Sequence, residues 1–461
     1  MSRLLRLLAV LLAPSTLAAQ ALPPAATVHR LADSLARAFV AAEKSPSVAI
    51  GIVRGSDTVT LAAYGMADLE NGIAATARSV YRIGSVTKQF TAAMIMQLVE
   101  GDSLNLDDPI GGHLDSLPAA WQPVTVRQLL NHTSGIPSYT ALGPEWMKRW
   151  GEEMTPEAIV ALTADKPMDF SPGTDWRYDN TGYVLLGMLI EKATGQTWAA
   201  ALQTRLAEPL GLTDTRECLT TPIIPRRVRG YDRNAGAWVN TQYLAMSQPY
   251  AAGAMCSTVH DLARWNRALH SGKVVSEESY RLMVTPDLPS GVNGPGYGFG
   301  LMQDMVAGRT MISHGGGIHG FNTANAWVPS AELSVSVLTN SGGAPAPELL
   351  QQLALVALGQ PLPTRPPVVS LAANERDRYV GVFTLNFPGA GQRTFTVALA
   401  DTGLSGTLEG QQPVPMLYFG NDTFGVNFDP SVRLTFTVRD GRAMSMTLEQ
   451  RGRTVSGERT Q

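Results

Sequence analysis

Ser85 and Lys88 are the residues of this sequence whose types and spacing first suggest a reaction. From Phe90 to Val99 the apolar residues recur with the three-and-four spacing of a helix, and Gly101 is the expected C-cap. The pattern predicts that Ser85 lies at the N-terminus of a helix and that Lys88 follows one turn later on the same face. The two side chains are therefore expected to touch.

This contact has a chemical meaning, because a serine hydroxyl becomes a good nucleophile when a neighbouring base takes its proton. A lysine can be that base only while it is neutral, a state that burial favours. Lys and Arg total 36 in this chain and only six of them are lysines, so position 88 carries the rarer basic side chain that can lose its proton near neutral pH. Ser-x-x-Lys is a short pattern, however, and its value depends on companion motifs elsewhere in the chain.

Tyr178 and Asn180 are the first companions. They lie on a polar loop that precedes a strongly apolar helix expected from Tyr183 to Ala193. A loop at a helix entrance is a common place for ligand contacts, and a simple capping turn is the alternative interpretation. In the earlier segment 131–137, His132 and Ser134 are expected to form a capped turn rather than a second catalytic pair.

A run of three glycines, Gly315–Gly317, follows His314. Consecutive glycines let the backbone approach a ligand closely and leave N–H groups free to point at an anion. A flexible hairpin is the alternative. The chain contains no Gly-x-Ser-x-Gly, which disfavours an α/β-hydrolase, and no His-Glu-x-x-His, so neither a metal nor another cofactor is expected.

Composition limits the partners and the location. A net charge of −3 gives no basic footprint for nucleic acid, and no apolar run after the N-terminal segment reaches the length of about 18 residues needed to span a membrane. Residues 1–21 have the pattern of a signal peptide, with Arg3 and Arg6 before an apolar stretch and a small-residue cleavage site at Ala19–Ala21. We therefore expect a periplasmic or secreted protein, in which Cys218 and Cys256 form either a disulfide or two buried thiols.

The 461 residues divide into further segments. A first domain is expected over 22–358, a proline-rich linker over 359–370, and a C-terminal β domain over 371–461. Short alternating segments in the last of these predict a small antiparallel barrel or sandwich.

The ordered motifs resemble the serine β-lactamase and penicillin-binding-protein superfamily, in its class C β-lactamase-related branch. The resemblance spans about residues 27–358 and rests on four stretches in order: Gly84–Lys88, Leu129–Gly135, Phe170–Gly173 with Tyr178–Tyr183, and His314–Gly316. It implies an α+β fold in which an antiparallel sheet is flanked by helices and accompanied by an all-helical subdomain. The C-terminal segment resembles the lipocalin-like barrels that accompany this branch.

The resemblance also implies roles for individual residues. Ser85 would be the acylated nucleophile, Lys88 its base or proton partner, and Tyr178 the group that passes a proton to the leaving group. Asn180 would hold Lys88 and a substrate amide, and the backbone N–H groups of Ser85 and Gly317, the residue after Gly316, would form the oxyanion hole. Two positions depart from the pattern of true β-lactamases: His314 stands where many relatives have a lysine, and Tyr139 lies near the position of a substrate-contacting glutamine.

Together these observations predict an exported serine hydrolase that cleaves an amide, ester or β-lactam through an acyl-enzyme. A D-amino-acid peptidase or an esterase is favoured over a dedicated β-lactamase. The expected partner is a small-molecule or peptide substrate, including one derived from peptidoglycan, and the oligomeric state is left open. The alternative is a non-enzymatic cell-envelope protein that binds peptidoglycan or a peptide.

Overall fold

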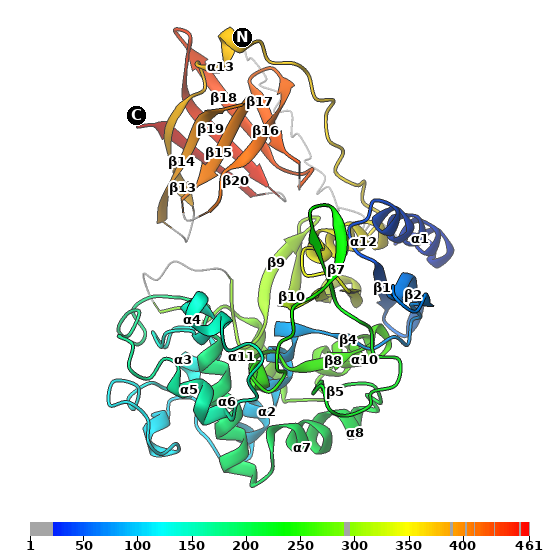
Figure 1. Ribbon diagram of the computed structural model, residues 1–461, viewed down its shortest axis with the longest axis vertical. Helices are drawn as coiled ribbons and strands as arrows, with labels where there is room; N and C mark the ends of the chain where they lie inside the picture. Colours follow the sequence, from blue (N-terminus) through cyan, green and yellow to red (C-terminus); the bar gives the residue numbers. More distant parts are fainter. Residues whose placement is uncertain are drawn as a thin grey trace, which may run out of the picture.

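The computed structural model describes residues 22–289, 296–387, 391–401, 403–409, 411–427, 429–450 and 453–460. The predicted signal peptide, residues 1–21, lies outside the described residues. The chain forms a mixed helix-and-sheet part followed by a separate β-barrel, joined by an extended segment (Figure 1). This arrangement confirms the predicted α+β fold with a C-terminal all-β domain.

A seven-stranded antiparallel sheet is the centre of the first part, in the order β3-β2-β1-β12-β11-β10-β9. Its middle strands are rich in apolar residues, and β12 is buried along its whole length because helices cover both faces. The strands are β1 Ser47–Arg54, β2 Asp57–Asp68, β3 Ile73–Ala74, β9 Met302–Val306, β10 Arg309–Ile318, β11 Phe321–Val328 and β12 Leu333–Thr339.

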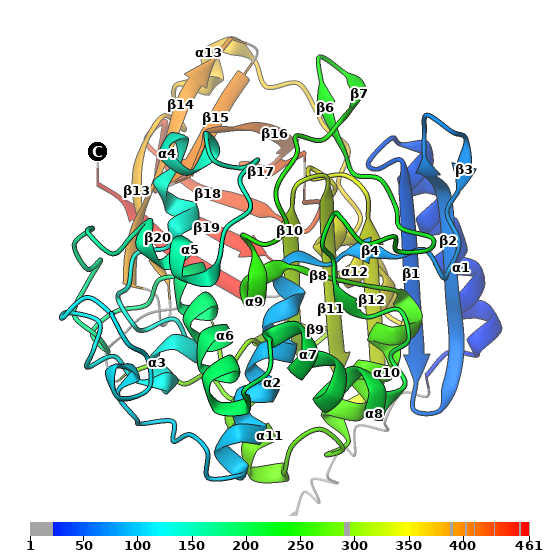
Figure 2. The same cartoon turned by 60° about the horizontal axis from the view of Figure 1, so that its bottom comes forward.

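Three helices cover this sheet. Helices α1 (Ala25–Ala41) and α12 (Ala346–Ala357) pack on one face, where their apolar residues form a core with β1, β11 and β12. Helix α10 (Val259–His270) lies on the opposite face and begins at the N-cap Thr258, whose side chain accepts the backbone N–H of Asp261. The sheet therefore lies between two helical layers (Figure 2).

A helical subdomain continues from the α10 side of the sheet (Figure 2). Its central helix α2 (Thr87–Glu100) contacts α6 (Asn180–Thr194) and is buried over nearly all of its length. Phe90 of α2 stacks on Trp265 of α10 with ring centroids 3.9 Å apart, which ties the subdomain to the helical layer of the sheet. The other elements include α3 Val126–Leu130, α4 Pro144–Met147, α5 Pro156–Ala161, α7 Trp198–Leu202, α9 Tyr250–Gly253 and α11 Glu277–Val284.

Two small sheets connect these layers. One has the order β4-β8-β5, with β4 Tyr81–Arg82, β8 Met255–Ser257 and β5 Arg216–Glu217. The other is the hairpin of β6 (Tyr231–Asn234) and β7 (Ala237–Asn240).

Cys218 and Cys256 are both buried near the β4-β8-β5 sheet, and the structure has them as free thiols rather than as a disulfide. The side chain of Cys256 hydrogen-bonds to Cys218 and lowers the pKa of its thiol.

The C-terminal domain is a closed eight-stranded barrel, which decides between the two predicted all-β forms. Aromatic side chains such as Phe383, Phe424 and Phe436 fill its interior. The strands are β13 Gly381–Phe387, β14 Gly391–Ala400, β15 Gly403–Leu408, β16 Val414–Gly420, β17 Thr423–Val426, β18 Arg433–Arg439, β19 Arg442–Gln450 and β20 Arg453–Arg459. Among the described residues, no helix is both long and apolar enough to cross a membrane.

Candidate active site

Ser85 lies in a short turn that leads directly into α2. The turn Gly84–Val86 is a 3-10 helix, so the predicted helix N-terminus is preceded by one tighter turn than the sequence pattern suggested. It is held from the N-terminal side because Ile83 donates its N–H to the carbonyl of Met255, 2.9 Å away. The nucleophile position is therefore anchored to β8 on one side and to a buried helix on the other.

The glycines of β10 approach this turn closely. A Cβ atom added to Gly316 would lie 1.9 Å from the carbonyl oxygen of Ile83, and a Cβ added to Gly84 would lie 3.0 Å from the nitrogen of Gly317. Only residues without side chains can bring the two backbones this close, and Gly84 also has a left-handed φ of 51°. The strand consequently places Gly317 beside Ser85, as the predicted oxyanion hole requires.

Lys88 contacts the nucleophile from behind. Its Nζ lies 3.4 Å from Ser85 Oγ and donates to Asn180 Oδ1 and to the Ala252 carbonyl, each at 2.7 Å. The side chain is fully buried, and this burial lowers the pKa of Lys88 to about 7, although the carboxylate of Asp179 opposes the shift. A substantial fraction of Lys88 is thus neutral near pH 7 and able to accept a proton.

Tyr178 lies against Lys88, with its ring centroid 4.8 Å from Nζ. Its hydroxyl is buried and has no hydrogen-bond partner among the described residues. Burial raises the pKa of Tyr178, and the neighbouring Ser85 side chain only partly opposes that rise. The protonated hydroxyl therefore lies beside the nucleophile, in the position expected of a proton donor.

Asp179 explains how the Tyr178–Asn180 loop is held. Its carboxylate caps α6 by accepting the N–H groups of Thr181 at 2.7 Å and Gly182 at 2.9 Å. The N–H of Asp179 donates to His132 Nδ1 at 3.1 Å, and the hydroxyl of Ser134 accepts the N–H of Ile136. The interpretation of the His132 segment as a capped, structural turn is therefore confirmed.

His314 is oriented away from the role of a charged substrate ligand. Its Nε2 lies 2.9 Å from the hydroxyl of Tyr297 and its Nδ1 lies 2.5 Å from the carbonyl of Gly315. Burial lowers the pKa of His314 to about 3, with a further contribution from Lys88, so the imidazole is neutral. Its predicted contact with substrate stays a prediction.

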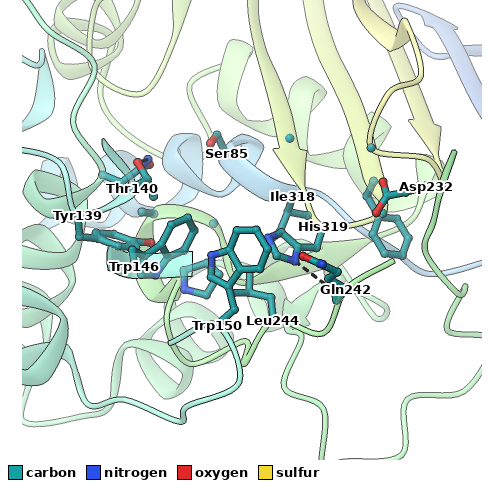
Figure 3. Close-up of a pocket in the computed structure, with 18 residues that line it drawn as sticks. Ser85, Tyr139, Thr140, Trp146, Trp150, Asp232, Gln242, Leu244, Ile318 and His319 are labelled. Atoms are coloured by element: carbon teal, nitrogen blue, oxygen red, sulfur yellow. Dashed lines mark hydrogen bonds between the residues drawn. The ribbon is translucent and has the colours of Figure 1, made fainter. Parts of the chain in front are cut away.

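A pocket of about 600 Å³ opens in front of Ser85 (Figure 3). Aromatic side chains form one side of it, and Asp232 lies at the other end (Figure 3). The lining residues are Ser85, Tyr139, Thr140, Trp146, Trp150, Asn180, Asp232, Gln242, Leu244, Pro249, Ala252, Gly253, Gly317, Ile318, His319, Gly320, Phe321 and Gly342.

Gln248 fixes the aromatic side of the pocket. Tyr139 donates its hydroxyl to the Gln248 carbonyl at 3.1 Å, and Trp146 donates its indole N–H to the Gln248 side chain at 2.7 Å. Trp150 packs edge-on against His319 with centroids 4.2 Å apart. The wall is therefore held by hydrogen bonds and ring packing rather than by loose loop side chains.

The structure separates the predicted site residues into two groups. Ser85, Tyr139, Asn180 and Gly317 line the pocket, whereas Lys88, Tyr178, His314 and Gly316 are not among its lining residues. Sequence reasoning missed Trp146, Trp150 and Asp232. Two tryptophans four residues apart in a loop-rich segment were the one signal that could have indicated the aromatic wall.

This fold, with a serine and a buried lysine in contact at a pocket, defines the class of a serine hydrolase. The family model described as Beta-lactamase matches residues 32–358, and the chain belongs to this family.

Known proteins agree with this assignment. Penicillin-binding protein 4* of Bacillus subtilis is 27% identical over 431 residues, which are 88% of this chain and 93% of that protein. A D-aminopeptidase of Brucella ovis is 29% identical over 332 residues, 70% of this chain and 61% of that protein. Among solved structures, the octameric penicillin-binding protein homologue from Pyrococcus abyssi has a TM-score of 0.67 at 26% identity and covers 93% of this chain and 99% of that one. The D-amino acid amidase of Ochrobactrum anthropi has a TM-score of 0.63 at 28% identity and covers 72% and 97%.

Proposed function

We propose that this protein hydrolyses an amide or ester of a D-amino-acid-containing substrate through an acyl-enzyme on Ser85. The observation that carries the proposal is the contact of Ser85 Oγ with the buried Nζ of Lys88, whose pKa is lowered to about 7. Relatives named as D-aminopeptidase and D-amino acid amidase support this substrate class. Peptides derived from peptidoglycan belong to the same class.

In the acylation step, neutral Lys88 takes the proton of Ser85 as Oγ attacks the scissile carbonyl carbon. The backbone N–H groups of Ser85 and Gly317 stabilise the negative charge that develops on the carbonyl oxygen. Tyr178 gives its proton to the departing nitrogen or oxygen and recovers one from Lys88. A water molecule then attacks the acyl-enzyme, with the same residues carrying protons in the reverse direction.

Two features favour a peptidase or esterase over a dedicated β-lactamase. A lysine in place of His314 would offer a permanent cation to a substrate carboxylate, whereas His314 is buried and neutral and bonds to Tyr297. Tyr139 occupies the wall of the pocket and directs its hydroxyl to Gln248. Neither side chain provides the polar contacts that a carboxylate-bearing bicyclic drug would use.

Export is part of the same proposal, as are the domain limits of 22–358 for the hydrolase domain and 371–461 for the C-terminal barrel. The charge and apolar pattern of residues 1–21 supports removal of a signal peptide and a periplasmic or secreted location. Mass spectrometry of the protein recovered from cell fractions tests this, because the mature chain is expected to begin near Leu22. Recovery of the intact N-terminus in the cytoplasm would refute it.

Intact-mass spectrometry with a fluorophosphonate and with a fluorescent penicillin tests the nucleophile. Wild-type protein is expected to gain a single fluorophosphonate adduct that is absent in Ser85→Ala. Ser56→Ala, an exposed serine in the β1–β2 turn, is the matched control and should label like the wild type. An adduct that persists in folded Ser85→Ala would refute the assignment of Ser85.

A further inference from the structure

The pocket in front of Ser85 contains one fixed charge. Of its lining residues, Asp232 is the only aspartate, glutamate, lysine or arginine. Burial lowers the pKa of His319, the lining histidine, so this ring adds no positive charge near neutral pH. Asp232 is therefore the one charged side chain that lines the pocket, and the nearby Arg82 lies over the lining ring of Phe321, 5.8 Å from its centroid.

This carboxylate is oriented but has no cationic partner. Thr241 donates its hydroxyl to Asp232 Oδ2 at 2.6 Å, which fixes the side chain, and Oδ1 lies over the backbone of Gly342, where an added Cβ would come within 2.7 Å. Among the described residues, Asp232 forms no ion pair within 4.0 Å, and the nearby Arg229 and Arg233 pair with other acids. An oriented carboxylate that faces a pocket without a counter-ion is suited to bind a cation from the substrate.

The position of Tyr178 indicates which part of the substrate reaches Asp232. Tyr178, which would protonate the leaving atom, has a buried hydroxyl and does not line this pocket, whereas Asn180, which would hold the substrate amide, does. The pocket begins instead at Ser85, Asn180 and Gly317, where the acyl carbonyl would lie. It therefore holds the acyl part of the substrate.

The backbone between the Ser85 end and the Asp232 end of the pocket gives the approximate distance between them. Gly317 lies beside the Ser85 turn, and Gly320, at the end of the β10–β11 hairpin, lies next to Gly342 and so to Asp232. Three residues of chain separate these ends, which is at most about 10 Å at about 3.3 Å per residue, or about the reach of a side chain of about 7 Å plus a hydrogen bond of about 3 Å. An α-amine is only about 2.5 Å from its carbonyl carbon, whereas the amine of an extended lysine side chain is about 7 Å away.

We propose that Asp232 binds a protonated amine at the far end of the acyl group, about one residue or one lysine side chain from the scissile carbonyl. This inference rests on the proposed function and names its substrate class. Ile318, Leu244 and Phe321 line the pocket and would contact the apolar stem of such a group. The substrate would be a cationic acyl donor, and an anionic acyl group would be repelled.

The test compares thiobenzyl esters of Nα-acetyl-lysine and Nα-acetyl-norleucine, in both enantiomers, on wild type and Asp232→Asn. Asparagine keeps an acceptor for Thr241 and removes the charge. We expect wild type to favour the lysine ester at least about tenfold in kcat/KM, mainly through KM, because a charge-assisted hydrogen bond contributes more than a neutral one. Asp232→Asn should lose this preference, because its kcat/KM on the lysine ester falls toward that on the norleucine ester.

Two further comparisons test where the substrate amine must lie and whether the preference depends on Asp232 rather than on another nearby charge. A glycyl-alanyl ester and its N-acetyl form show whether the amine of a preceding residue replaces the lysine amine. Glu70→Gln removes a charge that contacts the same β6–β7 hairpin through Asn240 but does not line the pocket, and it should retain the preference. A preference that survives in Asp232→Asn, or is absent from wild type with both amine donors, would overturn the proposal.

A binding measurement on Ser85→Ala protein, which cannot turn over substrate, tests the Asp232 amine site independently of the proposed reaction. Pentylammonium should quench or shift the tryptophan fluorescence of Ser85→Ala protein at lower concentration than pentanol, and this difference should vanish in the double variant with Asp232→Asn. If the wild type hydrolyses neither ester, the proposed reaction fails while this measurement still decides the role of Asp232. Equal binding of the two probes to Ser85→Ala would refute the amine site.

Discussion

The rate of acylation should fall on the acid side with an apparent pKa near 7, because protonation of Lys88 removes the base. Burial lowers the pKa of this amine to about 7 from an ordinary value of 10.5. At pH 8 about nine-tenths of Lys88 would then be neutral, and at pH 5 about one-hundredth. We expect kcat/KM to be level above about pH 8 and to decrease about 90-fold between pH 8 and pH 5.

Apart from Asp179, the other ionisable groups of the site do not account for this decrease in rate between pH 8 and pH 5. Burial lowers the pKa of His132 well below its usual range and that of His314 to about 3, while it raises the pKa of Tyr178. Asp179 is the competing candidate, since burial raises its pKa to about 7. The assay must therefore separate Lys88 from Asp179.

Asp179→Asn separates them. The Asp179 carboxylate raises the pKa of Lys88, so its removal should move the acid limb to lower pH if Lys88 is the titrating group. If Asp179 itself titrates, the decrease in rate at low pH should disappear.

Lys88→Arg, which cannot become neutral in this range, should be inactive at every pH tested. The measurement is the second-order rate of fluorophosphonate labelling or ester hydrolysis from pH 5 to 9, with far-UV circular dichroism as a control for folding. A flat profile in wild type, or an active Lys88→Arg enzyme, would refute this account of the base.

Two further predictions concern the backbone contact and the leaving group. Gly316→Ala should destabilise the fold by about 3 kcal/mol in a thermal or denaturant melt, because its Cβ would lie 1.9 Å from the Ile83 carbonyl. Gly317→Ala is the matched control for stability, since an added Cβ there meets nothing within 4 Å, and equal melts for the two would contradict the packing argument. Tyr178→Phe should slow amide hydrolysis by about 10² to 10⁴-fold and slow an activated p-nitrophenyl ester much less, because a good leaving group needs no proton. Equal losses on both substrates would instead indicate that the hydroxyl positions the substrate.

Local patterns were sufficient to predict the elements that carry the nucleophile. The helix expected after Ser85, with Gly101 as its C-cap, is α2, Thr87–Glu100, and the helix expected from Tyr183 to Ala193 lies within α6, Asn180–Thr194. Both have periodicities that match their burial, because each packs one or both faces against a single core. The final barrel strand β20 was not expected, since Val455 is the only strongly apolar residue of Arg453–Arg459 and closure of the barrel supplies the pairing.

The walls of the pocket could not be predicted from local patterns. Trp146 bonds to Gln248, which lies 102 residues later in the chain. Asp232, in the β6–β7 hairpin, lines the same pocket as Gly317, in the β10–β11 hairpin, although the two hairpins are distant in sequence. His314 lies on β10, before the glycine run, but the direction of its ring depends on Tyr297, which lies in a loop without a regular pattern. Such pairings depend on the tertiary arrangement of the elements and leave no periodic signal in the chain.

The burial of the side chains around Ser85 explains the charges of the site. The same desolvation that lowers the pKa of Lys88, and so provides a base, also keeps His314 neutral and Tyr178 protonated. Lys88 is therefore not a permanent cation beside Ser85, while the carboxylate of Asp232 lines the pocket in front of it. A substrate carboxylate would gain no ion pair in such a site and would be repelled by Asp232, whereas an ammonium group would be attracted. The proposed role of Asp232, together with the neutral base, therefore predicts a preference for cationic amide or ester substrates over the anionic β-lactams.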